Sequence, residues 1–254
     1  MSFQSAFSPV ASVYADEAVE VCNPDGTYPG LLVCDHARAS LPAEYAWLGL
    51  ATADLQRHIA YDIGIAPLVR ALSMLLDCPA ILTRQSRLLI DCNRWIRDPS
   101  SIPLVSDGIS VPGNHGQTQE ARAERWHRFF WPYHRTVHRM FAKVRSQHDA
   151  PIFLALHSCT RQMGGTVRDV DAGTFWHHDL RLSDRLINGL LRNGELSLRE
   201  NYPYCGFGGT SFTLDYHTWG HDIPACGLEI VNDLIATPTG QATWAARLAE
   251  VLAR

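Results

Sequence analysis

The 254-residue sequence lacks a long hydrophobic run and a paired-cysteine motif. No apolar stretch approaches the roughly 18 residues that a membrane span needs. The opening residues, MSFQSAFSPV, lack the basic region and long apolar core of a secretion signal. The seven cysteines are scattered, and none form a C-x-x-C pair, so neither a disulfide framework nor a cysteine zinc knuckle is indicated. We therefore expect a cytoplasmic protein with no membrane partner.

Excess positive charge is missing as well. The formal net charge is −4 and the isoelectric point is near 6.3, so no broad basic surface is available for nucleic acid. No glycine-rich phosphate loop follows an expected strand, because the glycines of residues 206–209 lie in an irregular region. These absences exclude nucleic acid as an expected partner and leave a small-molecule substrate. The oligomeric state is not indicated.

Apolar residues make up 46% of the chain, enough for a substantial core, and we expect one domain over residues 1–254. Strand-like segments fall at residues 30–33, 80–83, 88–90, 152–156, 196–199 and 228–231. Helical patterns fall at residues 54–76, with a break near Gly64 and Pro67, and at 119–147, 175–192 and 241–252. Because the two signals interleave, the predicted fold class is α/β. It is a three-layer sandwich with a mixed, mainly parallel sheet flanked by helices.

Two of the expected strands lead into a histidine. The run at residues 152–156 shows no alternation, which is typical of a strand buried on both faces, and His157 follows it. Residues 31–33 lead in the same way through Cys34 and Asp35 to His36. Ligands of open α/β sheets bind at the carboxyl ends of strands. One such histidine alone is more often a hydrogen-bonded structural residue, but the repeated arrangement favours a metal site between neighbouring loops.

A hydrolytic zinc site commonly has two histidines and a carboxylate as ligands, with one position open for water. Asp62 is the first choice for the carboxylate, and Asp35 and Asp91 are the competitors. Asp62 lies four residues after His58, so the two would share a face of a helix. The alternative for Asp62 is a helix cap, or an acceptor that orients a ligand histidine.

Catalysis also requires a general base, and Glu229 is the candidate. It lies between apolar residues of an expected strand that alternates, and burial there would raise its pKa. The alternative is an outward-facing residue or the partner of an arginine.

Arg87 and Arg94 flank the segment that ends at Asn93. A guanidinium group can hold a substrate carboxylate through two parallel hydrogen bonds, so Asn93 and Arg94 are candidates for substrate binding. Pro132 is expected to kink the helix at residues 119–147, and the kink could aim His134 at the same pocket. Residues 201–213 could form a lid or an ordinary surface loop.

Taken together, the motifs resemble those of the N-formylglutamate amidohydrolase family. They occur in the family's order between residues 33 and 234, so the resemblance covers most of the chain. Each motif is short, and the ordered set is what is specific. The motifs are Val33-Cys34-Asp35-His36-Ala37, His58-Ile59-Ala60-Tyr61-Asp62-Ile63-Gly64, Ser86-Arg87-Leu88-Leu89-Ile90-Asp91-Cys92-Asn93-Arg94, Pro132-Tyr133-His134, Leu156-His157-Ser158 and Glu229-Ile230-Val231-Asn232-Asp233-Leu234.

The resemblance implies a fold related to the zinc carboxypeptidases and a site with one zinc ion. By this resemblance, the roles are as follows: His36, Asp62 and His157 as metal ligands, Glu229 as general base, Arg87 as a stabiliser of the oxyanion, and Asn93 with Arg94 as the grip on a substrate carboxylate. Two departures stand out. Val231 occupies a position where the family usually has arginine, and Ala39 occupies the place of the glutamate in the carboxypeptidase His-x-x-Glu pair.

The implied reaction is hydrolysis of an N-formyl or N-acyl amino acid, with N-formyl-L-glutamate giving formate and glutamate. Two rival readings remain open. Cys159, two residues after His157, could be the nucleophile of a cysteine-dependent amidase, although neighbouring positions at a strand end point in different directions. The chain could also be a small-molecule binding protein that keeps the fold without catalysis.

Overall fold

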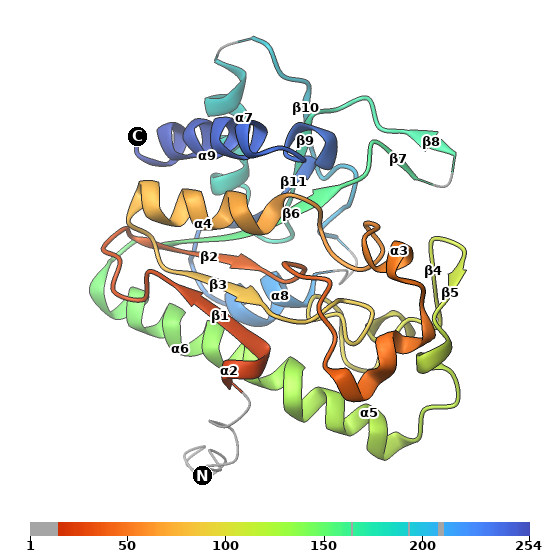
Figure 1. Ribbon diagram of the computed structural model, residues 1–254. Coiled ribbons are helices and arrows are strands. Elements are labelled where there is room, and N and C mark those ends of the chain that lie inside the picture. Colours follow the sequence, from red (N-terminus) through yellow and green to blue (C-terminus); the bar gives the residue numbers. More distant parts are fainter. Residues whose placement is uncertain (1–14, 164, 193, 208–210) are drawn as a thin grey trace.

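The computed structural model describes residues 15–163, 165–192, 194–207 and 211–254, and a seven-stranded sheet lies at its centre (Figure 1). In spatial order the strands are β1 (Val19–Cys22), β3 (Ala80–Thr83), β2 (Gly30–Cys34), β6 (Ile152–Cys159), β11 (Ala225–Val231), β9 (Ala172–Phe175) and β10 (Leu198–Glu200). Strands β3, β2, β6 and β11 run parallel, and β10 runs parallel to β9. The antiparallel pairs are β1 with β3 and β9 with β11.

Helices cover both faces of this sheet (Figure 1). One face packs against α4 (Ile65–Leu76), α7 (Arg181–Leu191) and α9 (Pro238–Leu252). The other packs against α2 (Ala15–Ala18), α6 (Trp131–Gln147) and α8 (Phe212–Thr218). The predicted α/β sandwich with a mixed, mainly parallel sheet is confirmed. The prediction of a single domain stays a prediction.

Every residue of the central strands β2, β3, β6 and β11 is buried. Continuous apolar segments of this kind suit parallel strands with helices on both sides. In β6, Phe153 and Ala155 face α6, whereas Leu154 and Leu156 face α4 and α9. The strand predicted at residues 228–231 forms as part of β11, and the alternative of an outward-facing Glu229 is wrong, because β11 is covered on both faces and Glu229 is buried.

The remaining elements are short, and several lie around the carboxyl edge of the sheet. The helical ones are η1 (Ala43–Gly49), α3 (Thr52–Leu55), η2 (Pro99–Ser101), η3 (Pro112–Asn114), α5 (Gln119–Arg125), η4 (Trp126–Phe130) and η5 (Asn232–Leu234). Two hairpins are formed by β4 (Val105–Ser106) with β5 (Ile109–Ser110), and by β7 (Gln162–Met163) with β8 (Thr166–Val167).

The helix expected at residues 119–147 forms as three consecutive helical segments, and the kink expected at Pro132 stays a prediction. A π-helical segment, η4, joins α5 to α6, and Pro132 lies in the first turn of α6. The residues before Pro132 are helical too, and the Trp131 N–H donates to the Trp126 carbonyl, so the proline lies within a continuous helical run and lacks the N–H that would bond to the preceding turn.

The helix expected at residues 54–76 is broken, as predicted near Gly64. The turn that separates α3 from α4 carries His58 and Asp62, so the two do not share a helix face as expected. Gly64 has a φ of +81°, and a Cβ atom there would lie 2.1 Å from the backbone oxygen of Ile235. Glycine therefore allows the close approach between this turn and the segment that follows β11.

Two other predicted elements are wrong in type or extent. The strand expected at residues 88–90 does not form, and residues 87–89 form a turn instead, because the Ser86 hydroxyl accepts a hydrogen bond from the Leu88 N–H and the Ser86 carbonyl accepts one from the Leu89 N–H. The helix expected from residue 175 begins at Arg181, and Phe175 ends β9 instead. Of the expected loop at residues 201–213, residues 208–210 lie outside the described part of the chain. None of the helices in the described ranges is long and apolar enough to cross a membrane.

Candidate active site

Four of the predicted site residues meet at the carboxyl edge of the sheet. His157 in β6 and Glu229 in β11 are paired in the parallel register, so their side chains share one face of the sheet. His36 follows the end of β2 by two residues, and its carbonyl accepts a hydrogen bond of 2.9 Å from the Asp62 N–H. The predicted strand end before His157 is too early, because β6 continues to Cys159.

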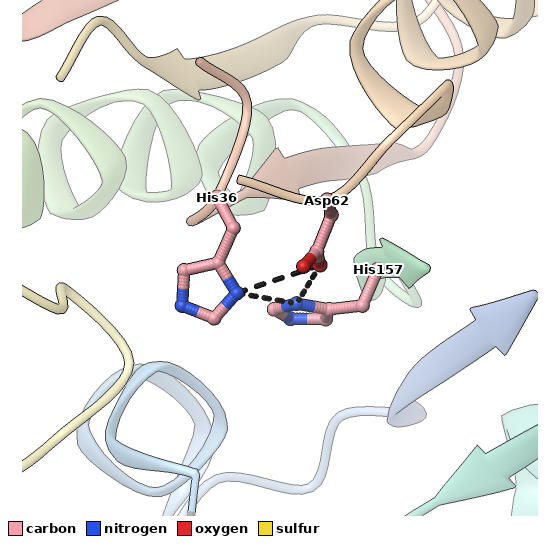
Figure 2. A group of neighbouring side chains, drawn as sticks. All are labelled: His36, Asp62 and His157. Carbon is pink, nitrogen blue, oxygen red and sulfur yellow. Dashed lines mark hydrogen bonds and ion pairs between the residues drawn. The ribbon is translucent and has the colours of Figure 1, made fainter. Parts of the chain in front are cut away.

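Figure 2 shows His36, Asp62 and His157 pointing toward a common centre. The Nδ1 atoms of the two histidines lie 3.3 Å apart. Oδ2 of Asp62 lies 3.4 Å from Nδ1 of His36 and 3.2 Å from Nδ1 of His157. All three side chains are buried.

This triangle has the dimensions of three ligands of one zinc ion. Tetrahedral bonds of about 2.0–2.1 Å place neighbouring ligand atoms about 3.3–3.4 Å apart. The donor set of two imidazole nitrogens and a carboxylate oxygen is also one that zinc prefers. The buried carboxylates of Asp35, Asp62, Asp91 and Glu229 supply negative charge that a bound cation would balance. The residues therefore fit a divalent metal ion.

The far sides of both imidazole rings face carboxylates. Nε2 of His36 lies 2.8 Å from Oδ1 of Asp91, and Nε2 of His157 lies 3.3 Å from Oδ2 of Asp35. Such partners hold a histidine in the tautomer and orientation that present its other nitrogen to a metal. Asp35 and Asp91 thus lie on the Nε2 side of the two imidazole rings, whereas Asp62 lies on the side where the two Nδ1 atoms approach each other.

The electrostatics of the site depend on burial and on charged neighbours. Burial alone would lower the pKa of His157, but the carboxylates of Asp35 and Asp62 raise it to about 10. Burial raises the pKa of Glu229 to about 7, and the negative charge of Asp62 adds to this rise. Glu229 Oε2 has no hydrogen-bond partner within the described ranges of the chain. It is therefore a carboxylate poised to exchange a proton near neutral pH.

A cavity of about 270 Å³ adjoins these groups. It has the size of a site for a small ligand. The lining residues are His36, His58, Asp62, Arg87, Asn93, Arg94, His157, Ser158, Phe175, Pro203, Tyr204, Cys205, Phe207, Ser211 and Glu229. All but one of the side chains predicted for metal binding, catalysis or substrate binding are in this set; His134 is the exception.

Arg87 is fixed between two carboxylates at the cavity wall. Its Nη1 lies 3.2 Å from Oδ1 of Asp62, and its Nε lies 3.6 Å from Oδ2 of Asp91. Nη1 of Arg94 donates to the backbone oxygen of Asn93 at 3.1 Å. These contacts hold positive charge beside the predicted metal ligands.

His134 is buried away from the cavity surface. One ring nitrogen lies 2.8 Å from the Cys92 carbonyl oxygen, and the other lies 3.1 Å from Nε2 of His217. Burial lowers the pKa of His134 to about 4, so the ring is neutral. Its place supports the backbone next to Asn93 and gives it no contact with a ligand in the cavity.

Sequence reasoning missed several contacts that shape the site. The Asn93 side-chain oxygen accepts hydrogen bonds of 3.1 Å from the Ser211 hydroxyl and from the Thr213 N–H. The Thr213 hydroxyl donates to Oδ1 of Asp35 at 2.7 Å, and the Ser158 N–H donates to Oδ2 of Asp62 at 3.1 Å. The only available signal was polar residues close to expected strand ends, which does not tell which pairs meet.

The Cys159 thiol is fully buried and is not among the lining residues. Burial raises its pKa to about 12, so a thiolate is strongly disfavoured at neutral pH. Both observations argue against the cysteine-dependent amidase.

An α/β sandwich whose carboxyl edge gathers histidines, carboxylates and arginines around a small cavity is the architecture of an enzyme that acts on small molecules. The family model of N-formylglutamate amidohydrolase matches residues 28–236. The chain therefore belongs to the N-formylglutamate amidohydrolase family, and its class of activity is hydrolase.

The chain is also similar to solved structures. Gene product Atu2144 from Agrobacterium tumefaciens is 33% identical, with a TM-score of 0.89 and 93% of each chain covered. The N-formylglutamate amidohydrolase from Ralstonia eutropha JMP134 is 17% identical, with a TM-score of 0.69, covering 92% of this chain and 95% of that one. The second likeness concerns the fold alone. No curated protein matches the chain.

Proposed function

We propose that the chain hydrolyses the amide bond of an N-formyl or other N-acyl amino acid, with N-formyl-L-glutamate as the first substrate to test, and that it depends on one zinc ion. The observation that carries this proposal is the triangle of His36 Nδ1, Asp62 Oδ2 and His157 Nδ1, with sides of 3.2–3.4 Å, beside a cavity lined by arginines and Glu229. Family membership supports the class of reaction.

His36, Asp62 and His157 would hold the zinc ion. When bound, zinc supplies Lewis acidity, which polarises a carbonyl and lowers the pKa of a coordinated water toward neutrality. Asp35 and Asp91 keep the two imidazole rings in the orientation that this role requires.

Glu229 acts as the general base. It takes a proton from the attacking water as the new carbon–oxygen bond forms at the formyl carbon. It then returns that proton to the amide nitrogen as the carbon–nitrogen bond breaks, so that formate and the free amine leave. Its burial keeps the pKa near 7, where a carboxyl group both accepts and donates protons.

Arg87 and Arg94 have separate tasks. Arg87, fixed by Asp62 and Asp91, donates to the oxygen that gains negative charge during attack. Arg94 lines the cavity beside Asn93 and binds the carboxylate of the substrate, together with the side-chain N–H groups of Asn93. His134 supports this segment through the Cys92 carbonyl rather than by touching the substrate.

The test is turnover by the purified full chain. Release of formate from N-formyl-L-glutamate is compared with release from N-formyl-L-leucine, and with release of acetate from N-acetyl-L-glutamate. Activity should be lost on chelation and should return with zinc. Full activity after removal of all metal would exclude the zinc mechanism, and no turnover of any N-acyl amino acid by the zinc-loaded protein would exclude the proposed reaction.

A further inference from the structure

A second group of metal-binding side chains lies outside the site described above. His177, His178 and Asp215 each offer a ligand atom, and these atoms all lie within 4.8 Å of one another. Nδ1 of His177 is 3.1 Å from Oδ1 of Asp215. Asp215 is a buried residue of α8, whereas His177 is half-buried and His178 exposed in the segment between β9 and α7.

The three side chains surround a cavity of about 20 Å³. A volume of this order holds one water molecule or one ion, and it is too small for an organic ligand. His221 and Asp179 also line it. Asp179 accepts hydrogen bonds from the N–H and the guanidinium group of Arg181, so its carboxylate is already engaged.

The imidazole rings are already ordered by their neighbours. The rings of His177 and His178 stack with centroids 3.8 Å apart. The Trp219 ring packs against both, at 5.6 Å from His177 and 4.5 Å from His178. Ligands held in place before binding lose less conformational entropy when an ion binds.

We propose that His177, His178 and Asp215 form a second metal site, which takes a divalent ion of the class that imidazole prefers, such as Zn²⁺, Ni²⁺ or Cu²⁺. The ion links α8 to the segment that follows β9. Both segments border the wall of the active-site cavity. Phe175, the last residue of β9, and Ser211, which precedes α8, line that cavity. The His177 ring also contacts Phe207, which lines it as well. This proposal does not depend on the proposed function.

The first experiment counts metal ions. Metal-stripped full-length protein is dialysed against a low concentration of zinc, and bound zinc is measured for the wild type, H36N, H177N/H178N and H127N. His127 is an exposed histidine of η4 and provides the matched control. We expect two ions in the wild type and in H127N, and one ion in each of the other two variants.

The outcomes separate the two sites. If the wild type binds one ion and H177N/H178N binds none, the second site stands and the proposed catalytic zinc does not. If H177N/H178N binds as many ions as the wild type, the second site is overturned. Far-UV circular dichroism and the melting temperature verify that each variant is folded. His127, His177 and His178 are not fully buried, so we expect both readings of the H127N and H177N/H178N variants to match the wild type in the absence of metal.

A spectroscopic test identifies the ligands. Cu²⁺ bound to H36N should give an electron paramagnetic resonance spectrum with coupling to imidazole nitrogen. That coupling should disappear in the triple variant H36N/H177N/H178N and persist in H36N/H127N. A spectrum without nitrogen coupling, or one unchanged in the triple variant, would overturn the proposal.

Discussion

At the scale of single residues, Glu229 is the most informative side chain. It is a carboxylate buried in the middle of a hydrophobic strand, and Oε2 accepts no hydrogen bond from the described part of the chain. Burial of a carboxyl group without such a partner destabilises the fold, and strongly shifted pKa values of this kind cluster at functional sites. Glu229 is therefore better explained by chemistry than by stability.

Glu229→Gln should lower kcat by roughly 10²–10⁴-fold, because the amide cannot accept the proton of the attacking water. Zinc content and melting temperature should be retained, since glutamine is nearly the same size and removes a buried charge. In the wild type, kcat/KM should rise with pH as Glu229 ionises. The midpoint of this rise should lie at or below about pH 7, because a bound cation stabilises the carboxylate. The pH profile of the variant should lack this limb. A variant with more than about a tenth of wild-type kcat would remove Glu229 from its role.

Cys159→Ser tests the thiol alternative. We expect kcat to change by less than about twofold, because the buried thiol has a pKa near 12 and is not part of the cavity wall. The measurement is formate release by the zinc-loaded variant. A loss beyond about 100-fold with full zinc content would revive the cysteine-dependent amidase.

The residues that meet at the site could be named from the sequence, but their contacts could not. His36, His157 and Glu229 were identifiable because polar side chains in or directly after apolar strands are unusual. The sequence does not show which aspartate points to the same centre as the two histidines. That depends on the shape of the turn around Gly64, and local sequence patterns do not encode this shape. His134 was expected at the pocket, but as a buried residue of α6 its ring lies 2.8 Å from the Cys92 carbonyl oxygen.

At the scale of elements, most of the sheet was predictable, including the edge strand β10 at the segment expected at residues 196–199, but β1 and β9 were not. Apolar runs identified β2, β3, β6 and β11. Strands β1 and β9 are as short as β3 but lack a continuous apolar run, and whether such a segment forms a strand depends on the neighbour with which it pairs. Residues 88–90 are as apolar as a strand, but local hydrogen bonds to Ser86 turn the chain there.

Gly64→Ala should destabilise the protein by roughly 2–5 kcal/mol, which combines the strain of a left-handed backbone with a clash against the Ile235 carbonyl. The melting temperature should fall by roughly 5–15 °C. Gly116→Ala is the matched control, because Gly116 also has a positive φ of +64° but a Cβ there meets nothing within 4 Å. It should cost only roughly 1–2 kcal/mol. Equal losses in the two variants would show that the contact with Ile235 does not matter.

At the scale of the whole molecule, the three predicted metal ligands come from distant parts of the chain. His36 follows β2, Asp62 precedes α4 and His157 lies in β6, so their donor atoms converge only when the sheet and its connections are complete. An ion held by all three binds the folded state and has no equivalent site in the unfolded chain. Its binding free energy therefore adds to the free energy of unfolding.

Zinc should raise the melting temperature, and the increase should require His36. At a free zinc concentration about 100 times the Kd, linkage gives about 2.7 kcal/mol, or a rise of roughly 5–10 °C for a chain of this size. The measurement compares chelated and zinc-loaded protein in the H177N/H178N background, so that the second site does not contribute. Adding His36→Asn to that background should abolish the shift, because an asparagine there leaves two of three ligands. A shift of equal size with and without His36 would mean that the stabilising ion is bound elsewhere.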